Sequence, residues 1–386
     1  MRLPLAFEID SRDGVSAKDE RLTNVLSESD EGGDKAVVRP GLVTQAEATG
    51  VGGGLVAFNN ELVSVYGTTL GINEQVFSIG SWASETVPAR SWTGLGASST
   101  KFCAVGGGYS AVSTDGVAWS ESSSIGAGAW CSPAWNGTVF CTVQDSSDEA
   151  AVSTDGLTWT VHSLIDVHNW CSVAWNGTLF CAVCYDDNVC ATSPDGQTWT
   201  IEALPVAFSA WTIAAGGATF CVVGGGESTV STDGASWSAA SSIVGLSGGV
   251  QVTWNGTKFC ATASGADNAN SADGINWVAG DAFDDSVPHY MAGSNGLFVA
   301  VTASGYLTAN ISTDNGASWT TTTLAAAGGE DYVGVAGMGN QFFAIAELAG
   351  IGSLGVADQT NSIAPLSSIA TGLYDFAQSP LLANYF

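Results

Sequence analysis

The sequence predicts an all-β protein, and within that class a β-propeller with an extended N-terminal arm. Composition gives the first indication: Gly accounts for 49 of 386 residues and charged residues for only 12%. Such a chain suits short strands joined by tight turns and does not suit helical bundles. The second observation is a phrase of the type Ser-x-Asp-Gly-x-x-Trp, which recurs with tryptophans 38 to 42 residues apart. The third is an Asn-Gly-type turn between two apolar runs in most repeats, a strong hairpin signal.

Each repeat reads as four strands: an apolar strand, a turn, a second apolar strand, a short third strand, the Asp-Gly turn and a fourth strand carrying Trp. Four short strands every ~40 residues are typical of a propeller blade. Degenerate hairpins at 52–67 and 333–347 flank the clear repeats, so we expect eight blades, with seven as the close alternative. The six clear repeats end at Trp119, Trp159, Trp199, Trp237, Trp277 and Trp319.

The chain divides by composition into three segments. Residues 1–50 hold six of the nine Lys and Arg side chains and lack the repeat, so we expect an extended arm that docks on another subunit or protein. Residues 51–371 form the expected propeller. The apolar tail, 372–386, either closes the ring or packs on a neighbouring subunit. Deleting the arm should leave a soluble, folded β protein that no longer assembles.

The net charge of −28 excludes several classes of partner. Tight binding to nucleic acid depends on cations that release counterions from phosphate, and attraction to an anionic membrane needs them too. The start of the chain becomes charged before an apolar run reaches signal-peptide length, and no stretch approaches the ~20 apolar residues of a membrane span. We therefore expect synthesis in a cytosol, with no membrane partner.

The recurring turn resembles the Asp-box, a hairpin found in sialidases and many other propellers. Its residue types have a local purpose, because the carboxylate and the Ser hydroxyl accept backbone N–H groups, Gly supplies positive φ and Trp fills space between blades. We expect structural roles for these Trp side chains and for the Asp-box carboxylates. The latter are Asp115, Asp155, Asp195, Asp233, Asp273 and Asp314.

No catalytic constellation emerges from the sequence. A sialidase needs a cluster of arginines for the substrate carboxylate, and no arginine follows Arg90. Glycoside hydrolysis by two carboxylates stays formally open, although no pair stands out. We expect neither catalysis nor a cofactor, and we expect no metal from the cysteine spacing. Five cysteines share one repeat position and are expected to be small buried side chains: Cys103, Cys141, Cys181, Cys221 and Cys260. Acidic loops at 145–149, 185–188 and 281–285 are expected to be solvated, with calcium as the alternative.

The arm carries a second resemblance. It contains SRDGVSAKDERLTNVLSESDEGGDKAVVRPGL, in which Asn24 and Glu28 form an N-x-x-x-E phrase and Arg39, Pro40 and Gly41 follow. This opening resembles that of the tail nozzle proteins of short-tailed bacteriophages, also called packaged-DNA stabilisation or tail accessory proteins. The resemblance covers the arm in sequence and the remainder only in architecture. It implies that these five residues dock the arm. From the length of the chain we expect a nozzle-tip domain of that family to be missing or much reduced.

The resemblance implies a structural virion protein. Nozzle proteins form a homohexameric ring below the portal and adaptor, where they retain DNA and let it pass, and they contact other tail proteins. The implied location is the virion tail, assembled in the host bacterial cytoplasm. A cation-poor ring agrees with this role, because it would not hold the passing phosphates. A receptor- or glycan-binding propeller on a virion or cell surface is the first alternative, and a glycoside hydrolase is the second.

Overall fold

The computed structural model describes the strands within 25–66 and, with short gaps, residues 69–365. Side chains are described from residue 78 to 357. The gaps after residue 69 are 186, 206–211, 247–250, 264, 266, 284–288, 303–306, 325–330 and 348–349. Two compact units are present: Phe77–Asp358 forms one, and Met1–Val76 with Gln359–Phe386 forms the other. The first unit is shorter at both ends than the expected propeller, 51–371.

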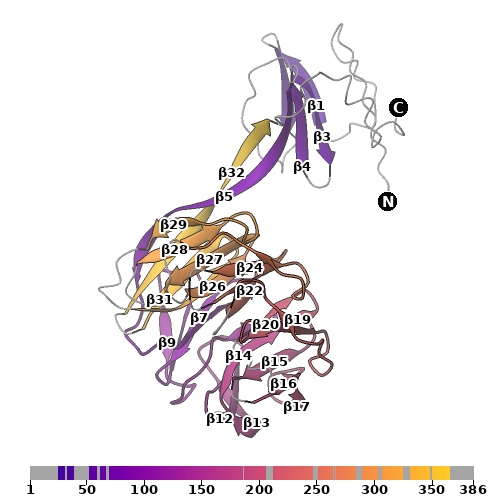
Figure 1. Ribbon diagram of the computed structural model, residues 1–386. Helices are drawn as coiled ribbons and strands as arrows, with labels where there is room; N and C mark the ends of the chain where they lie inside the picture. Colours follow the sequence, from indigo (N-terminus) through magenta and orange to yellow (C-terminus); the bar gives the residue numbers. More distant parts are fainter. Residues whose placement is uncertain are drawn as a thin grey trace. The chain divides into compact units, whose positions relative to one another are not determined.

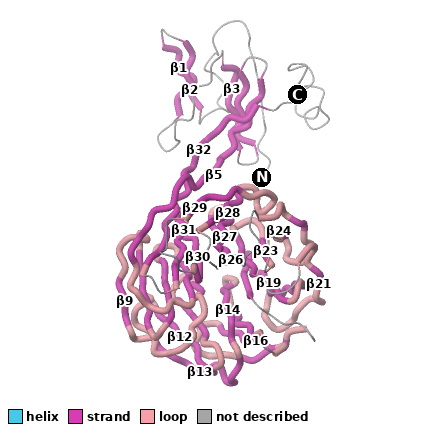
Figure 2. Tube along the Cα trace, turned by 60° about the vertical axis from the view of Figure 1, so that its left-hand side comes forward, coloured by secondary structure: helices cyan, strands magenta, loops and turns pink. Residues whose placement is uncertain are grey.

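The larger unit is a β-propeller of seven blades, and the described residues contain no helix (Figures 1 and 2). Six blades are four-stranded antiparallel sheets whose strands pair in chain order. Blade 1 comprises β6 (Gly94–Ala97), β7 (Phe102–Gly106), β8 (Tyr109–Ser113) and β9 (Ser120–Ser122). Blade 2 comprises β10 (Ala134–Trp135), β11 (Phe140–Val143), β12 (Ser147–Ser153) and β13 (Thr160–His168). Blade 3 comprises β14 (Trp170–Trp175), β15 (Phe180–Cys184), β16 (Val189–Ser193) and β17 (Thr200–Ala203).

The next three blades repeat the same order. Blade 4 comprises β18 (Thr212–Gly216), β19 (Thr219–Gly224), β20 (Glu227–Ser231) and β21 (Ser241–Ser242). Blade 5 comprises β22 (Gln251–Trp254), β23 (Phe259–Thr262), β24 (Asn268–Ser271) and β25 (Val278–Ala279). Blade 6 comprises β26 (His289–Ser294), β27 (Leu297–Thr302), β28 (Thr308–Ser312) and β29 (Thr320–Thr323). In Figure 1 the colours pass around this unit in sequence order, from purple β7 to orange β28.

Blade 7 closes the ring with strands from both ends of the propeller sequence. Its strands are β30 (Tyr332–Met338), β31 (Gln341–Ala346), the long β32 (Ile351–Pro365) and the long β5 (Thr69–Thr86). They belong to a sheet of order β3-β4-β5-β32-β31-β30. The division between the two units falls within β5 and β32. Pairing of the first and last strands of the propeller sequence within one blade joins the two ends of the ring by backbone hydrogen bonds.

The expectation of eight blades is therefore wrong. The hairpin at 52–67 does form, as β3 (Gly52–Phe58) and β4 (Glu61–Tyr66), but it belongs to the smaller unit. Its two apolar strands have the sequence pattern of the first half of a blade, and the next strand, β5, belongs to blade 7. The hairpin at 333–347 is β30 and β31, as expected of a blade.

The smaller unit contains one more described hairpin. Strand β1 (Val25–Asp30) pairs antiparallel with β2 (Gly33–Val38), so part of the expected extended arm is a hairpin. Glu28 lies in β1 opposite Lys35. The other expected docking residues, Asn24, Arg39, Pro40 and Gly41, lie outside the described residues, as does the tail 372–386.

Antiparallel pairing gives each blade two different ends. The turn between the first and second strands and the turn between the third and fourth strands lie at one end, which we call the turn end. The second-to-third connection and the link from the previous blade lie at the other end, which we call the pocket end. The Asn-Gly turns and the Asp boxes are at the turn end. Asp145, Tyr185 and Asp187 lie in second-to-third connections at the pocket end, whereas residues 147–149 of the first expected acidic loop belong to β12.

Candidate functional site

The Asp-box residues form closed local networks at the turn end. Asp155 Oδ1 accepts the N–H groups of Leu157 at 2.8 Å and Thr158 at 2.7 Å, and the Ser153 hydroxyl donates to it at 2.9 Å. The same hydroxyl oxygen accepts the Gly156 N–H at 2.8 Å. These bonds satisfy the donors of a tight turn. The same carboxylate bonds, one from the Ser hydroxyl and others from backbone N–H groups of the turn, occur at Asp115, Asp195, Asp233, Asp273 and Asp314.

Each network favours the charged form of its carboxyl group. Burial by itself would raise the pKa of Asp155, but the N–H donors of Thr158 and Leu157 and the hydroxyls of Ser153 and Thr158 outweigh it and lower the pKa to about 2. The pKa is lowered at the other five Asp boxes as well, by the same kinds of donor. A carboxylate whose acceptor capacity serves its own turn is a structural group.

The Asp-box tryptophans fold back on their own turns. In five boxes the indole Nε1 donates to the carbonyl of the Gly three residues earlier, as from Trp159 to Gly156 at 3.1 Å. Trp319 is different, because its Nε1 donates to Asn268 Oδ1 of blade 5 at 3.1 Å. The Trp119 ring lies 5.0 Å from that of Phe343 in blade 7. These rings thus fill the spaces between blades.

The repeated cysteines pack beneath the Asp-box glycine of the following blade. A methyl group on Gly196 would come within 3.1 Å of Cys141 Sγ and 2.6 Å of Val152 Cγ1. Small residues on both sides allow this close approach of two blades. The other pairs are Gly156 with Cys103, Gly234 with Cys181, Gly274 with Cys221, and Gly316 with Cys260. All five cysteines are fully buried, and burial raises the pKa of each thiol, which disfavours the reactive thiolate form.

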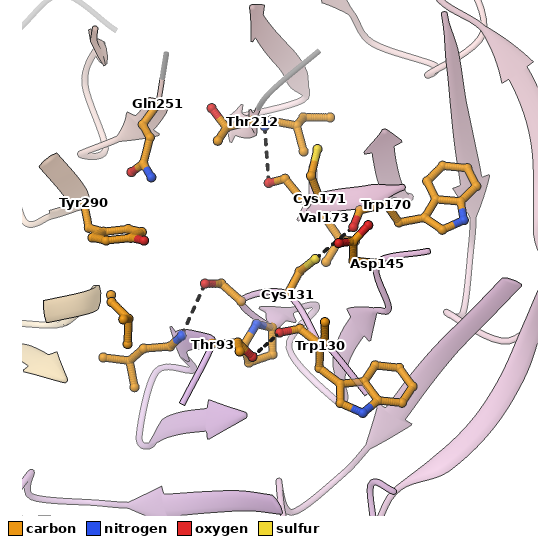
Figure 3. A pocket seen from close by; sticks show the side chains of 18 of the residues that line it. Thr93, Trp130, Cys131, Asp145, Trp170, Cys171, Val173, Thr212, Gln251 and Tyr290 are labelled. Atoms are coloured by element: carbon orange, nitrogen blue, oxygen red, sulfur yellow. Dashed lines mark hydrogen bonds between the residues drawn. The ribbon is translucent and has the colours of Figure 1, made fainter. Parts of the chain in front are cut away.

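A pocket of 430 Å³ lies at the other end of the propeller, lined by residues from all seven blades (Figure 3). Most of them begin a first strand, and Asp145 and Tyr185 come from second-to-third connections. The walls combine apolar side chains such as Leu95, Val173 and Val252 with hydroxyl, thiol and amide groups. Its volume is in the usual range for small-ligand sites.

Most polar side chains in the pocket bind the backbone of a neighbouring blade. Thr93 Oγ1 donates to the Trp130 carbonyl at 2.7 Å, and Cys131 Sγ donates to the Trp170 carbonyl at 3.2 Å. Backbone N–H groups of the next blade donate to Thr212 Oγ1 and to Gln251 Oε1, at 2.9 and 3.3 Å. These bonds connect adjacent first strands, so the polar lining chiefly holds the ring together.

The pocket was not predicted from the sequence, although the sequence contains a pattern that marks part of its lining. In blades 1 to 3 a Trp directly precedes a small polar residue, as in Trp92-Thr93 and Trp130-Cys131. Trp92, Trp130 and Trp170 are at most 1% exposed, whereas the following residue lines the pocket. In these three blades the Trp-small-polar pair marks the start of the first strand.

The charges around the pocket are almost all negative. Asp145 lines it, and the nearby carboxylate of Asp187 lies 2.9 Å from His168 Nδ1. Beyond residue 50 the sequence has only three Lys or Arg side chains. Arg90 binds both carboxylate oxygens of Glu121, at 2.9 and 3.1 Å, while the other two lie at the turn end. Lys101 Nζ donates to the Asp155 carbonyl, and Lys258 Nζ donates to Asn270 Oδ1.

Two further kinds of site receive no support. Within the described residues, no group of three or more His, Cys, Asp and Glu side chains is placed to hold a metal ion. The described part of the chain also has no helix that could span a membrane.

Burial raises the pKa of the pocket thiol Cys131 to about 12, with the nearby Asp145 carboxylate adding to the effect, so this thiol is not activated.

Comparison with known proteins places the fold in the β-propeller class. No family model and no curated protein matches the sequence. Among solved structures, YCF48 bound to D1 peptide matches with a TM-score of 0.54 and 13% identity over 73% of this chain and 98% of that one. Virginiamycin B lyase from Staphylococcus aureus matches with a TM-score of 0.61 and 10% identity, over 71% and 99%. The WD40 propeller domain of Doa1 matches at 0.55 and 12%, over 72% and 96%. At these identities the likeness shows the fold alone.

Proposed function

We propose that this chain is a structural virion protein, the tail nozzle subunit of a short-tailed bacteriophage. Its propeller would be a rigid, non-catalytic module, and its terminal unit would dock on the portal and adaptor and on other tail proteins. The protein would assemble as a homohexamer in the bacterial cytoplasm and remain in the virion tail. There it would help retain DNA and let it pass during ejection.

The division of the chain is the observation that carries the proposal. Both chain ends belong to one unit, Met1–Val76 with Gln359–Phe386, and the propeller is a continuous insertion between them. The nozzle-like opening falls in that terminal unit. A compact unit that contains both chain ends, distinct from the propeller unit, suits a subunit that docks on its neighbours by one part of the chain.

Charge supports the proposal from a second direction. The three cations after residue 50 are already engaged, two of them with oxygen atoms of neighbouring side chains and one with a backbone carbonyl. The described part of the propeller therefore offers no cluster of Lys and Arg on which a passing phosphate would be retained.

Subunit counting of the full-length purified protein tests the proposal. We expect mass photometry and negative-stain class averages to show a sixfold ring, alone or after addition of the portal–adaptor complex of the same phage. We also expect no shift of a DNA duplex at 50 mM salt. A protein that stays monomeric or trimeric, and does not bind that complex, would instead support a receptor-binding propeller.

Catalysis is tested by turnover of a broad panel of polysaccharides, including host surface glycans. We expect none. Reproducible cleavage that is lost when one pocket-end Asp or Glu is replaced by Ala would support a glycoside hydrolase in place of the nozzle.

A further inference from the structure

The pocket has a chemistry that the nozzle role does not use. We propose that it binds the side chain of a lysine or arginine presented by a partner polypeptide. The inference concerns a binding site on the propeller and is independent of how many subunits assemble. Three features of the pocket support it: the polar groups that form no bond between blades, the negative charge around them and the ring of Tyr290.

An anionic ligand does not fit this pocket. Among the residues whose side chains are described, no Lys or Arg lines it, and the one at the pocket end, Arg90, is already bound by both oxygens of Glu121. The sequence supplies no other cation beyond residue 50 except Lys101 and Lys258 at the turn end. A phosphate or carboxylate would therefore have to lose its water without a compensating charge.

A neutral sugar fits poorly as well. Sugar recognition needs several side chains with free donors and acceptors. In this pocket four polar groups already form hydrogen bonds with the backbone of the next blade: those of Thr93, Cys131, Thr212 and the Gln251 side-chain carbonyl. Using them for a ligand would weaken the bonds that join the first strands.

A cation with an apolar stem matches what remains. Asp145 Oδ1 accepts only the exposed Ser146 hydroxyl, at 3.3 Å, and its Oδ2 has no protein partner among the described residues. Tyr290 projects into the pocket from the other side, and apolar side chains such as Leu95 and Val252 line the space between (Figure 3). A guanidinium or ammonium group would gain a charge-assisted bond from Asp145, and its methylene stem would bury against the apolar walls. The Tyr290 ring adds a surface that attracts cations.

The rim extends the same preference beyond the pocket. Asp331 directly precedes β30 and Glu347 directly follows β31, so both lie at the pocket end, where the Glu347 N–H donates to the Asp331 carbonyl at 3.0 Å. Burial raises the pKa of the Tyr290 phenol, and these two carboxylates add to the effect. Asp187 and the exposed Tyr185 lie at the same end. A polypeptide with further basic residues beside the inserted one would meet these carboxylates, whereas a small monoamine carries no second charge with which to meet them. This favours a polypeptide as the source of the cation.

Fluorescence anisotropy with a labelled hexa-arginine peptide, at 150 mM salt and with the full-length protein, tests the inference. We expect measurable binding that Asp145→Asn weakens about tenfold and Tyr290→Ala weakens by about three- to tenfold, because each removes one favourable contact. The matched control is Asp267→Asn, which removes an exposed carboxylate at the same end but outside the pocket. It should change the affinity by less than about twofold.

Four outcomes would overturn the inference. Equal weakening by Asp145→Asn and Asp267→Asn would mean diffuse attraction to an acidic protein. No binding at about 1 mM peptide would mean that the pocket takes no such side chain. Free spermidine binding as tightly as the peptide, with the same dependence on Asp145, would identify a small amine as the ligand instead of a polypeptide. A hexa-citrulline peptide, which keeps the shape without the charge, should not bind. Equal binding of that peptide would exclude recognition of a cation.

Discussion

The two ends of the propeller follow different rules. At the turn end, each blade repeats the same residues, and each Asp box satisfies its own backbone, as Asp155 does with Leu157 and Thr158. At the pocket end, equivalent positions hold different side chains, including Thr93, Cys131 and Tyr290. Repetition therefore marks the residues that build the fold, and variation marks the end at which a ligand could be recognised.

The difference has a physical cause. Each turn must provide acceptors for its own backbone N–H groups in every blade, so the same short Asp-box sequence recurs. The first strands meet around one axis, and a pocket there needs one set of groups from the whole ring, not seven copies of one group. Mutations at the two ends should accordingly separate stability from recognition.

The largest effect is expected from Gly196→Ala at the turn end. The new methyl group would lie 2.6 Å from Val152 Cγ1, and φ is +77° at this position, so we expect a loss of about 3 kcal/mol in the free energy of unfolding. Urea denaturation of the full-length protein measures it. Gly177→Ala is the matched control, because φ is +95° there but nothing lies within 4 Å. It should cost only about 1 kcal/mol. Equal losses would mean that the blades do not pack through this contact.

Asp155→Ala should have the next largest effect. It leaves the N–H groups of Leu157 and Thr158 and the Ser153 hydroxyl without their acceptor, although water reaches this turn. We expect a loss of about 1–2 kcal/mol at pH 7, from the same denaturation measurement. A change below about 0.3 kcal/mol would contradict a structural role for the Asp box.

The difference between the wild type and Asp155→Ala should shrink in acid. The folded state lowers the pKa of Asp155 to about 2, below the ordinary value of 3.8. The contribution of the carboxylate is therefore complete above that ordinary value and disappears as the pH falls through the folded value. Denaturation midpoints of both proteins between pH 5 and pH 2 measure this convergence. A difference that stays constant over this range would show that the charge of Asp155 is irrelevant to the turn.

The smallest effect on stability is expected at the pocket end. Asp145→Asn removes a carboxylate whose only side-chain partner among the described residues is the exposed Ser146 hydroxyl. We expect a change within about 0.5 kcal/mol, measured by the same method. A loss as large as that of Asp155→Ala would erase the distinction between the two ends and make Asp145 part of the fold.

The comparison also explains which sequence predictions succeeded. The propeller was predictable because the Asp-box phrase and the Asn-Gly turns are local and recur every ~40 residues. The count of eight blades was not, because the 52–67 hairpin has the local pattern of a blade but belongs to the other unit. Local sequence patterns predict hairpins, but they do not predict which sheet a hairpin joins.

The sequence by itself determined the strands, the turns and the chemistry within each repeat, since these depend on residues only a few positions apart. Tertiary structure alone decided how many blades close the ring, that β5 and β32 complete the last one, and that Asp145 and Tyr290 face one pocket. Residues from blades far apart in the sequence meet only because ring closure brings the first strands around a common axis. No local interaction encodes that arrangement.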